Sequence, residues 1–348
     1  RPSHPGGPGS VLTLDGSMGE GGGQILRTAL ALSSVTGTPF RIRNIRAARS
    51  RPGLGRQHLT AVQAAVEVTG ADVDGAQLGS TDLTFRPTEV SSGDFQFSTD
   101  GAGSTTLVLQ TILPPLVEAP GDSRIVLEGG THNPSAPPFE FVAKAFLPLL
   151  ERMGCSIELE LNRPGFYPAG GGRIDCWIEP SGKPTPLALP ERGPVVRRAA
   201  RAVVSDLPRH IAERELETVG ELLDIPPDHR EVVEVQDPRG PGNVLLVEVE
   251  CEKVTEVFTG FGKPGVPAEE VATGAAEATR EWEAADVAVG PQLADQLLLP
   301  LARAGGGSFT TVEPTTHAET NAEVIRRFLD VEVAFEEGGS GRWQVIVG

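Results

Sequence analysis

The chain has 348 residues, 39% of them hydrophobic, and a formal net charge of -17 at pH 7. No apolar run approaches the roughly 18 residues that a helix needs to cross a bilayer, so the sequence predicts a soluble protein without a membrane partner. Cys155, Cys176 and Cys251 are far apart and not near paired histidines, which excludes a disulfide framework and a zinc site and indicates a cytoplasmic protein.

Residues 1–10, RPSHPGGPGS, precede the first strand-like run, VLTLDG, and contain no apolar segment. They therefore do not resemble a signal peptide, and we expect a tail or an expression remnant. The length of the remaining chain favours more than one structural unit.

Basic residues are unevenly distributed along the chain. Only four of the 30 basic residues are lysines, and residues 21–66 contain seven arginines but no aspartate or glutamate. Charge segregated in this way can draw an anion into one cleft of an acidic protein. A solvated arginine-rich loop is the alternative interpretation.

Three stretches of the chain follow one pattern. Residues 19–37, 100–121 and 288–307 each open with a glycine-containing loop, continue with apolar residues at helical spacing and stop at glycine. A β-branched strand, a loop, a second helix and a closing strand follow each stretch. Because self-similarity indicates repeated units, we predict an α/β (α+β) fold with three βαβαβ-type units whose helices cover one face of each sheet.

The third copy is preceded by roughly 100 additional residues with their own pattern of strands and helices. These include the helical runs IAERELETVGELLDI and AEEVATGAAEATREWEAA. We therefore expect a smaller inserted α/β domain at 187–285. Residues 11–186 and 286–348 would then form a large catalytic domain.

The loop GEGGGQ at 19–24 directly follows the strand VLTLDG and directly precedes a helical run. Glycines let backbone N–H groups approach an anion, and the start of a helix adds a positive partial charge. The loop lacks the GK[ST] of a P-loop, and a plain tight turn is the alternative. Glu20 is a candidate ligand for a divalent metal that also binds phosphate, unless it is simply exposed to solvent.

Three further loops carry residues suited to binding a phosphate or a base. RAARSRPGLGRQHLTA at 46–61 supplies arginines, which bind phosphate oxygens in pairs, and then Gln57 and His58 at a helix start. THNPSAPPFEF at 131–141 is stiffened by proline and forms either the apolar wall of a base pocket or a helix cap. GFYPAGGG at 165–172 is a glycine turn with the only tyrosine, Tyr167.

His317 lies in the corresponding loop of the third copy, within PTTHAETNAEVIRRFL. Thr316 with Glu319 and Thr320 with Glu323 both match a capping box, so the helix begins just before or just after the histidine. The positive end of the helix then favours neutral, nucleophilic imidazole, although a surface or capping histidine is the alternative. If the copies pack together, their loops bring the arginines, the prolines and the histidine to one site, where attack on phosphorus is feasible.

Nine motifs in order carry a family resemblance: LDGSMGEGGGQILR, RPGLGRQHLTAV, GSTTLVLQTILP, GGTHNPSAPP, GFYPAGGG, DLPRHIAERE, GPGN, LADQLLLP and HAETN. From about Leu14 to its end, the chain resembles the RNA 3'-terminal phosphate cyclase family. The resemblance implies a three-repeat large domain, related to the repeat of enolpyruvyl transferases, with a smaller inserted domain. The acidic, lysine-poor composition indicates an archaeal, halophile-like source.

The resemblance also implies an ATP-dependent reaction in three steps. His317 would attack the α-phosphorus of ATP to give covalent histidine–AMP and pyrophosphate. The AMP would move to the 3'-phosphate of an RNA, and the neighbouring 2'-hydroxyl would then close a 2',3'-cyclic phosphate and release AMP. The implied cofactors are ATP and a divalent metal, Mg²⁺ or Mn²⁺. The implied partner is RNA with a 3'-terminal phosphate, and a homodimer is left open.

The family's functional positions map onto particular residues of this chain. Those that match the ATP site are Gln110, Pro137, Phe141, Gln292, Leu293, Ala294, Asp295 and Gln296. Those that match the RNA phosphate site are Arg27, Arg46, Arg49, Gln57 and His58, and Glu20 matches the metal site. Gln292 stands where the family pattern has a tyrosine that would stack on adenine opposite Pro137, so we expect weaker stacking.

Three other functions fit parts of the pattern. A non-cyclising relative that acts in ribosome assembly, as a nuclease or scaffold, would lack the nucleophilic histidine. An enolpyruvyl transferase would need substrate-binding lysines, and this chain has only four lysines. A plain RNA-binding module would require neither His317 nor Glu20.

Overall fold

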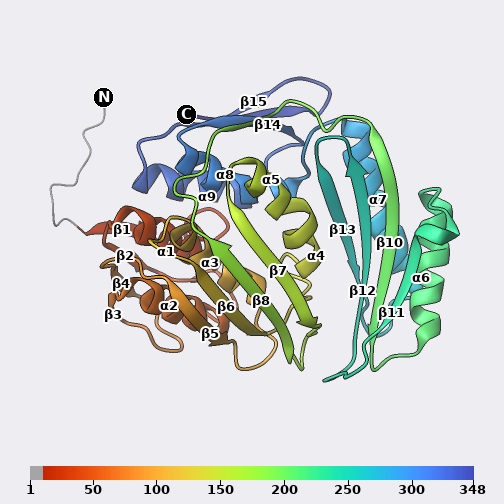
Figure 1. The fold of residues 1–348 in the computed structure, drawn as a ribbon, viewed down its shortest axis with the longest axis horizontal. Helices are drawn as coiled ribbons and strands as arrows, with labels where there is room; N and C mark the ends of the chain where they lie inside the picture. Colours follow the sequence, from red (N-terminus) through yellow and green to blue (C-terminus); the bar gives the residue numbers. More distant parts are fainter. Residues whose placement is uncertain (1–10) are drawn as a thin grey trace.

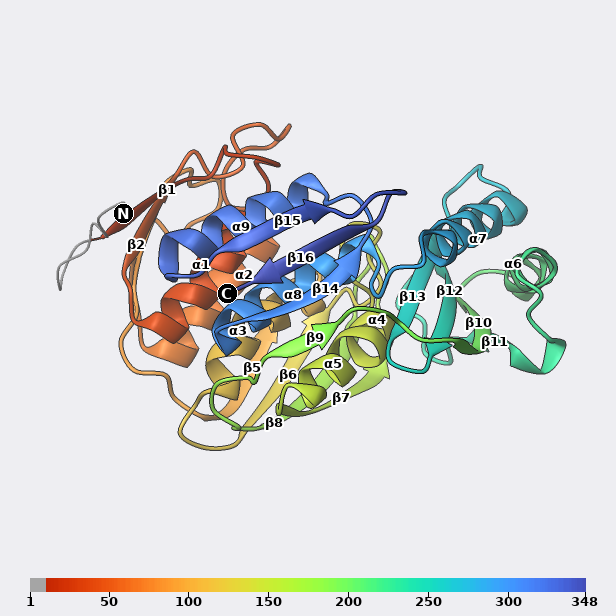
Figure 2. The same cartoon turned by 90° about the horizontal axis from the view of Figure 1, so that it is seen from above.

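Three four-stranded sheets lie around a central group of helices, and a fourth sheet stands on one side of them (Figures 1 and 2). This computed structural model describes residues 11–348, so the tail predicted for residues 1–10 lies outside the described residues. The α/β class that the sequence predicts is confirmed.

The three outer sheets belong to three equivalent units. The first contains β1 (Leu12–Asp15), α1 (Gln24–Thr36), β2 (Phe40–Arg43), α2 (Arg56–Thr69), β3 (Asp72–Asp74) and β4 (Leu83–Arg86). The second contains β5 (Gly93–Ser98), α3 (Thr105–Val117), β6 (Ser123–Gly129), α4 (Phe139–Phe141), a π-helical turn (Val142–Phe146), α5 (Leu147–Arg152), β7 (Ser156–Arg163) and β8 (Gly172–Glu179). The third contains β9 (Leu187–Leu189), α8 (Pro291–Ala304), β14 (Gly307–Thr311), α9 (Thr316–Phe328), β15 (Val333–Glu337) and β16 (Trp343–Val347).

The three sheets share one topology. Their strand orders are β1-β2-β4-β3, β5-β6-β8-β7 and β9-β14-β16-β15. In each, the first two strands are parallel and the other pairs are antiparallel. A parallel pair requires a crossover, and α1, α3 and α8 each lie within one. Each unit is therefore βαβαββ, with one more closing strand than the βαβαβ pattern predicts.

The inserted domain interrupts the third unit between β9 and α8. It contains β10 (Val195–Ser205), α6 (Arg209–Leu222), a 3₁₀ turn (Pro227–His229), β11 (Arg230–Glu234), β12 (Gly242–Cys251), β13 (Thr255–Phe261) and α7 (Ala268–Ala285). Its sheet has the order β11-β10-β12-β13, and α6 and α7 pack together beside it (Figure 1).

Strand β9 corrects the boundary expected for the insert. Its residues, Leu187–Leu189, fall inside the range 187–285 but pair in parallel with β14 of the large domain. The strand has only three residues, LAL, which is too short for a period-2 pattern to reveal. The insert therefore begins after this strand.

The central helices are buried on nearly all sides. Most residues of α1 are buried, and α1 packs against α2, α3 and α9. The helix ends at Gly37, whose φ of 70° is a conformation that glycine adopts readily. The main apolar core runs through all three units, whereas a second cluster around Phe258 and Trp282 lies within the insert. Among residues 11–348, none of the helices combines the length and the apolarity that a membrane span requires.

Two side chains connect the insert with the large domain at the start of α8. Glu256, on β13, accepts a hydrogen bond at 2.5 Å from the backbone N–H of Gly290, which caps α8. Arg192, after β9, donates to the carbonyls of Glu283 and Val287 and lies 4.8 Å from the Trp282 ring. Burial raises the pKa of Glu256 to about 7.

Glu215, on α6, is a second buried carboxyl. It accepts a hydrogen bond from Asn243 Nδ2 at 2.9 Å, its Oε1 has no partner in the described structure, and burial raises its pKa to about 7. Between pH 4.5 and 7 the folded chain keeps a proton that the unfolded chain has released. The contribution of this carboxyl to stability is therefore complete below pH 4.5 and is lost as the pH rises through 7.

We expect Glu215→Gln to flatten the pH dependence of stability. Removing this titration should abolish a decrease of roughly 3 kcal/mol in the free energy of unfolding between pH 4.5 and 7.5. Urea denaturation at several pH values measures this quantity, with Glu217→Gln, an exposed glutamate on the same helix, as the control. A Glu215→Gln variant with the wild-type pH dependence would contradict the prediction.

Candidate active site

The loops of the three units meet in one large cleft. A cavity of about 1180 Å³ is lined by the glycine loop before α1, the arginine loop before α2, the proline loop before α4 and the first turns of α8 and α9. On its other side it is lined by residues of β13 and α7 in the insert. The cleft therefore lies between the two domains, where loops far apart in the sequence converge.

Most of the site residues predicted from the sequence line this cleft. They are Glu20, Arg27, Arg46, Arg49, Gln57, His58, Gln110, Pro137, Phe141, Gln292, Asp295, Gln296 and His317. Leu293 and Ala294 differ from the others because both are buried in the apolar core. Successive residues of a helix are about 100° apart, so Gln292, Asp295 and Gln296 face the cleft while these two face away from it. We do not expect the side chains of Leu293 and Ala294 to contact a nucleotide in the cleft.

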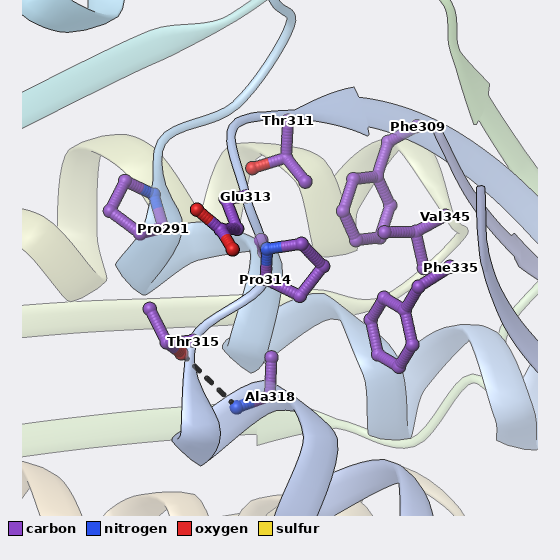
Figure 3. A pocket seen from close by; sticks show the side chains of 10 residues that line it. Pro291, Phe309, Thr311, Glu313, Pro314, Thr315, Ala318, Phe335 and Val345 are labelled. Carbon is purple, nitrogen blue, oxygen red and sulfur yellow. Dashed lines mark hydrogen bonds between the residues drawn. The ribbon is translucent and has the colours of Figure 1, made fainter. Parts of the chain in front are cut away.

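A second, small pocket lies behind the start of α9 (Figure 3). It has a volume of about 10 Å³ and is lined by Ala294, Phe309, Phe335 and other residues. That volume holds no more than about one water molecule, so the pocket is a packing defect rather than a nucleotide site.

His317 lies in the first turn of α9. The helix is capped by Thr315, whose Oγ1 accepts the N–H of Ala318 at 3.2 Å (Figure 3). Neither predicted capping box forms, because Thr315 has the extended backbone of a cap while Thr316 is already helical. Thr320 instead donates from its hydroxyl to the carbonyl of Thr316 at 2.6 Å. Of the two predicted helix starts, the one just before His317 is the observed one.

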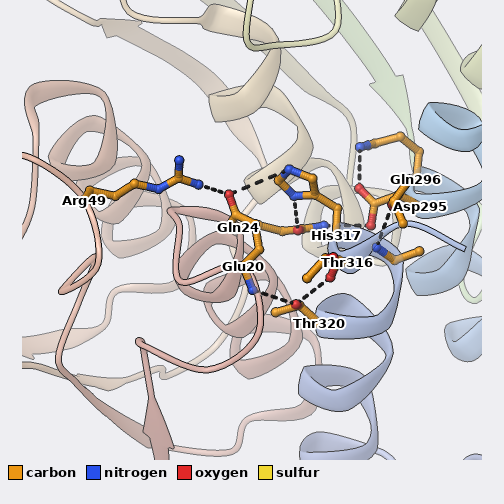
Figure 4. Close-up of polar contacts among 10 residues, drawn as sticks. Glu20, Gln24, Arg49, Asp295, Gln296, Thr316, His317 and Thr320 are labelled. Atoms are coloured by element: carbon orange, nitrogen blue, oxygen red, sulfur yellow. Dashed lines mark hydrogen bonds and ion pairs between the residues drawn. The ribbon is translucent and has the colours of Figure 1, made fainter.

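A buried hydrogen-bond chain fixes the protonation of the histidine ring (Figure 4). Gln24 Nε2 donates to Asp295 Oδ1 at 2.7 Å, so the amide oxygen of Gln24 faces His317 Nδ1 at 2.9 Å. An amide oxygen only accepts, and Nδ1 must therefore carry the proton. The other ring nitrogen, Nε2, keeps its lone pair and belongs to a side chain that is 55% exposed.

Asp295 is held by more than one amide. Asn321 Nδ2 donates to the same Oδ1 at 3.0 Å, and Thr28 donates to Asn321 Oδ1 at 2.9 Å. Burial raises the pKa of Asp295, while the bond from Gln24 opposes that shift. Gln24 and Asn321 lie within the sequence motifs, but nothing local assigns them a role. Only their shared contact with Asp295 does so, and Thr28 supports it indirectly through Asn321.

Glu20 lies beside the free nitrogen of the histidine. Its Oε1 accepts a hydrogen bond from Arg49 and is 3.7 Å from His317 Nε2 (Figure 4). Its backbone N–H donates to Thr320 Oγ1 at 3.2 Å, which anchors the glycine loop on α9. Its Oε2 is buried and has no hydrogen-bond partner within residues 11–348.

That unpartnered oxygen fits a divalent metal ligand. The described residues contain no group of three or more His, Cys, Asp or Glu side chains that could hold a metal. A hard cation such as Mg²⁺ is commonly held by one or two carboxylates together with substrate phosphates and water. Glu20 therefore fits a metal that arrives with a phosphate ligand, rather than a permanent metal centre.

Cations and a neutral histidine lie near the glycine loop and Glu20. Burial lowers the pKa of Arg27 to about 10, which leaves it charged at neutral pH, and Arg27 makes no ion pair in the described part of the chain. Burial, together with the charges of Arg27 and Arg46, lowers the pKa of His58 to about 3. His58 Nδ1 accepts the N–H of Gly55 at 3.2 Å, so its Nε2 carries the proton and is a neutral donor. Two guanidinium groups and one neutral N–H donor together are suited to binding an anion.

Two glutamines connect the units across the cleft. Gln57 Oε1 accepts the N–H of Ser104 at 2.8 Å, which leaves its NH₂ group available to a ligand. Gln110 Nε2 donates to Gln296 Oε1 and so joins α3 to α8. Both bonds cross between units, and the cleft is therefore defined only when all three units are packed.

The fold and the cleft define an α/β protein of three repeated units with a cation-lined cleft around a histidine. The RNA 3'-terminal phosphate cyclase family model matches residues 18–335. The chain is 54% identical over 328 residues to an RNA 3'-terminal phosphate cyclase of Koribacter versatilis, covering 94% of this chain and 92% of that protein. This chain belongs to the RNA 3'-terminal phosphate cyclase family.

Other relatives are similar over the same length. The chain is 52% identical to an RNA 3'-terminal phosphate cyclase of Ectopseudomonas mendocina, with 92% of this chain and 94% of that protein covered. It is 46% identical to one of Salmonella typhimurium, with 95% and 97% covered. A crystal structure of the enolpyruvyl transferase NikO from Streptomyces tendae aligns with a TM-score of 0.37 and 13% identity, covering 97% of this chain and 48% of that one. That TM-score is too low to indicate a shared fold.

The Gln24 contact predicts which nitrogen of His317 carries the proton. In the neutral ring we expect protonation at Nδ1, because the Gln24 amide oxygen faces that atom. Gln24→Leu should remove the preference for this tautomer. Imidazole ¹⁵N spectra of histidine-labelled protein measure it, and exposed His210 serves as an internal reference. Protonation of His317 at Nε2 in the wild type would contradict the assignment.

Proposed function

We propose that this protein converts RNA 3'-phosphate ends to 2',3'-cyclic phosphates in an ATP-dependent reaction, through a covalent histidine–AMP intermediate. The observation that carries the proposal is the Asp295–Gln24–His317 chain, which holds the proton on Nδ1 and leaves Nε2 free in a cleft lined by cations. The cyclase names of the relatives support the overall reaction.

In the proposed first step, His317 Nε2 attacks the α-phosphorus of ATP. A nitrogen–phosphorus bond forms, the bond from the α-phosphorus to the bridging oxygen breaks, and pyrophosphate leaves. The ring becomes a cation with its proton on Nδ1, which the Gln24 amide oxygen and the Asp295 carboxyl behind it stabilise. Gln24 and Asp295 act here as positioning residues.

In the second step, an oxygen of the RNA 3'-phosphate attacks the AMP phosphorus and the nitrogen–phosphorus bond breaks. His317 returns to its starting state, and the RNA carries a 3'-to-5' pyrophosphate linkage to adenosine. In the third step, the adjacent 2'-hydroxyl attacks the terminal phosphorus of the RNA. AMP leaves as the ring closes, and the hydroxyl proton passes to water. Close placement of the three groups is what the converging loops would supply.

The RNA phosphate would bind the wall formed by Arg27, Arg46, Gln57 and His58. Arginine guanidinium groups and neutral N–H donors bind phosphate without requiring a proton transfer. Since the pKa of His58 is lowered to about 3, its N–H would remain a neutral donor throughout the working pH range. The arrangement favours a phosphate monoester over a neutral end.

Glu20 would hold a divalent metal through its unpartnered Oε2. When bound, such a metal would neutralise part of the phosphate charge near His317. Arg49 now occupies the other oxygen of Glu20, and we propose that it turns to an RNA phosphate when the carboxylate binds the metal.

The adenine of ATP would lie between the proline loop and the start of α8. Pro137 and Gln292 both line the cleft, as do Gln110 and Gln296, which bond to each other. An amide offers hydrogen bonds but no aromatic face, so base recognition would depend less on stacking than with a tyrosine at this position.

We expect wild-type protein, incubated with α-labelled ATP and Mg²⁺ or Mn²⁺, to acquire an acid-labile AMP label. His317→Ala should reduce the label to background, because no other nitrogen nucleophile is held beside Glu20 in the described structure. His210→Ala, an exposed histidine in the insert, is the matched control. A plain RNA-binding protein would show no label, and an unlabelled wild type would overturn the proposed mechanism.

Arg49→Ala should separate the steps. Self-adenylylation should persist, whereas cyclisation of a 3'-phosphate RNA should slow by about 10- to 100-fold, as expected for one lost charge-assisted contact. Single-turnover transfer from preformed protein–AMP to RNA measures the effect, with Arg51→Ala from the same loop as control. Equal loss of both steps would place Arg49 with the nucleotide instead.

A further inference from the structure

Tyr167 is the only aromatic side chain among the exposed large apolar residues in the described part of the chain. Its relative exposure is 69%, and the others of this kind are Val11, Leu78, Val196 and Ile346. It lines the same cleft as His317, and its hydroxyl makes no hydrogen bond among residues 11–348. An exposed aromatic ring in a binding cleft is an available surface for a flat ligand.

The loop that carries Tyr167 is firmly held. Phe166, the residue before it, is buried and stacks on His132 with ring centroids 5.3 Å apart. The N–H of Gly170 donates to the carbonyl of Phe166 at 2.7 Å, which closes the turn beneath the tyrosine. Gly165 accepts hydrogen bonds from the N–H groups of Thr131 and His132 at 2.9 and 3.1 Å. The exposure of Tyr167 is thus a feature of an ordered turn.

Glycine contacts brace the same loop from two sides. A Cβ at Gly170 would overlap the carbonyl of Gly101, in the loop before α3. On the insert side, a Cβ at Gly242 would overlap the Phe166 ring. The loop therefore lies between the second unit and the insert, and it cannot swing away from the cleft without losing both contacts.

The bracing connects the loop of Tyr167 to the predicted phosphate wall. The loop that packs on Gly170 continues to Gly103, where a Cβ would lie 3.2 Å from Gln57 Cβ. The next residue, Ser104, donates its N–H to Gln57 Oε1. A short chain of direct contacts thus joins the tyrosine loop to a residue of the RNA phosphate site. The tyrosine loop also contacts the proline loop of the proposed adenine site, because the N–H groups of Thr131 and His132 donate to the carbonyl of Gly165.

We propose that Tyr167 is an RNA-binding residue on which a base at the 3' end of the substrate stacks. Single-stranded RNA is commonly held by stacking of its bases on exposed aromatic rings, and every base offers a flat face, so such a contact tolerates any sequence. If the terminal phosphate binds at the arginine and histidine wall, the adjoining nucleotides would pass the tyrosine loop as the RNA exits the cleft. This inference rests on the proposed function.

The test compares RNA binding with self-adenylylation. Tyr167→Ala should raise the KM for a 3'-phosphate oligonucleotide by about 5- to 150-fold, the range expected for one lost stack, with little change in kcat. The rate of protein–AMP formation and its dependence on ATP should not change. Tyr167→Phe should behave as wild type, because the ring face is retained, and Leu78→Ala controls for loss of an exposed apolar side chain outside the cleft.

Direct binding makes the inference testable even if no cyclisation occurs. An RNA with 2-aminopurine at its 3'-terminal or penultimate position should lose fluorescence on binding wild type, and this quenching should be absent with Tyr167→Ala. An unchanged KM, quenching that persists in Tyr167→Ala or a changed ATP dependence would overturn the inference. Failure of the wild type to form protein–AMP would overturn the proposed function alone.

Abasic RNAs identify the stacked nucleotide. Two 3'-phosphate RNAs are compared, one without its terminal base and one without its penultimate base. The increase in KM caused by Tyr167→Ala should disappear with the RNA that lacks the stacked base. If the full penalty remains with both abasic RNAs, the tyrosine does not contact a base of the RNA end, and the inference is wrong.

Discussion

The hydrogen bond from Gln24 to Asp295 is the contact on which the arrangement of the site depends. It joins the first turn of α1 in the first unit to α8 in the third, and both partners are buried. A buried carboxyl needs donors, and Gln24 and Asn321 supply them from two other helices. Because the Gln24 amide has only one remaining acceptor, satisfying Asp295 also decides where the proton of His317 resides. One requirement of packing thus sets the chemistry of the exposed nitrogen.

Repetition explains why so many cleft residues come from equivalent loops. In the first two units, the loops after the first two strands lead to helix starts, and in the third unit the insert intervenes before α8. The helices α1, α2 and α8 begin at glycines and have no acidic residue in their first turns. An acidic residue in a first turn would compete for the free N–H groups and repel a phosphate. At α8, Glu256 of the insert already accepts the N–H of Gly290. Two carboxylates flank the histidine: Glu20 lies 3.7 Å from Nε2, and Asp295 is connected to Nδ1 through Gln24.

Features that depend on consecutive residues can be predicted from the sequence. The glycine and arginine loops and His317 each have a signature in consecutive residues, and the order of helices and strands shows the repeat. The sequence could not predict the contact of Gln24 with Asp295, because the two residues are 271 positions apart and either one alone is an ordinary polar side chain. The extra closing strands were missed because β3 has only three residues, and β15 ends in exposed acids. The burial of Leu293 and Ala294 could have been predicted, because helical spacing places them on a different face of α8 from Gln292 and Asp295.

The place of the insert has a consequence for the order of folding. β9 pairs with β14, so Leu187 has to pair with Gly307, about 120 residues further along the chain. Closing a loop of that length costs conformational entropy, and the cost falls when the intervening chain has already become compact. The insert has its own apolar core and can collapse before the third unit closes. Asp295 and His317 both belong to that last unit, so a nascent chain completes the contacts around His317 only when the rest of the molecule is in place.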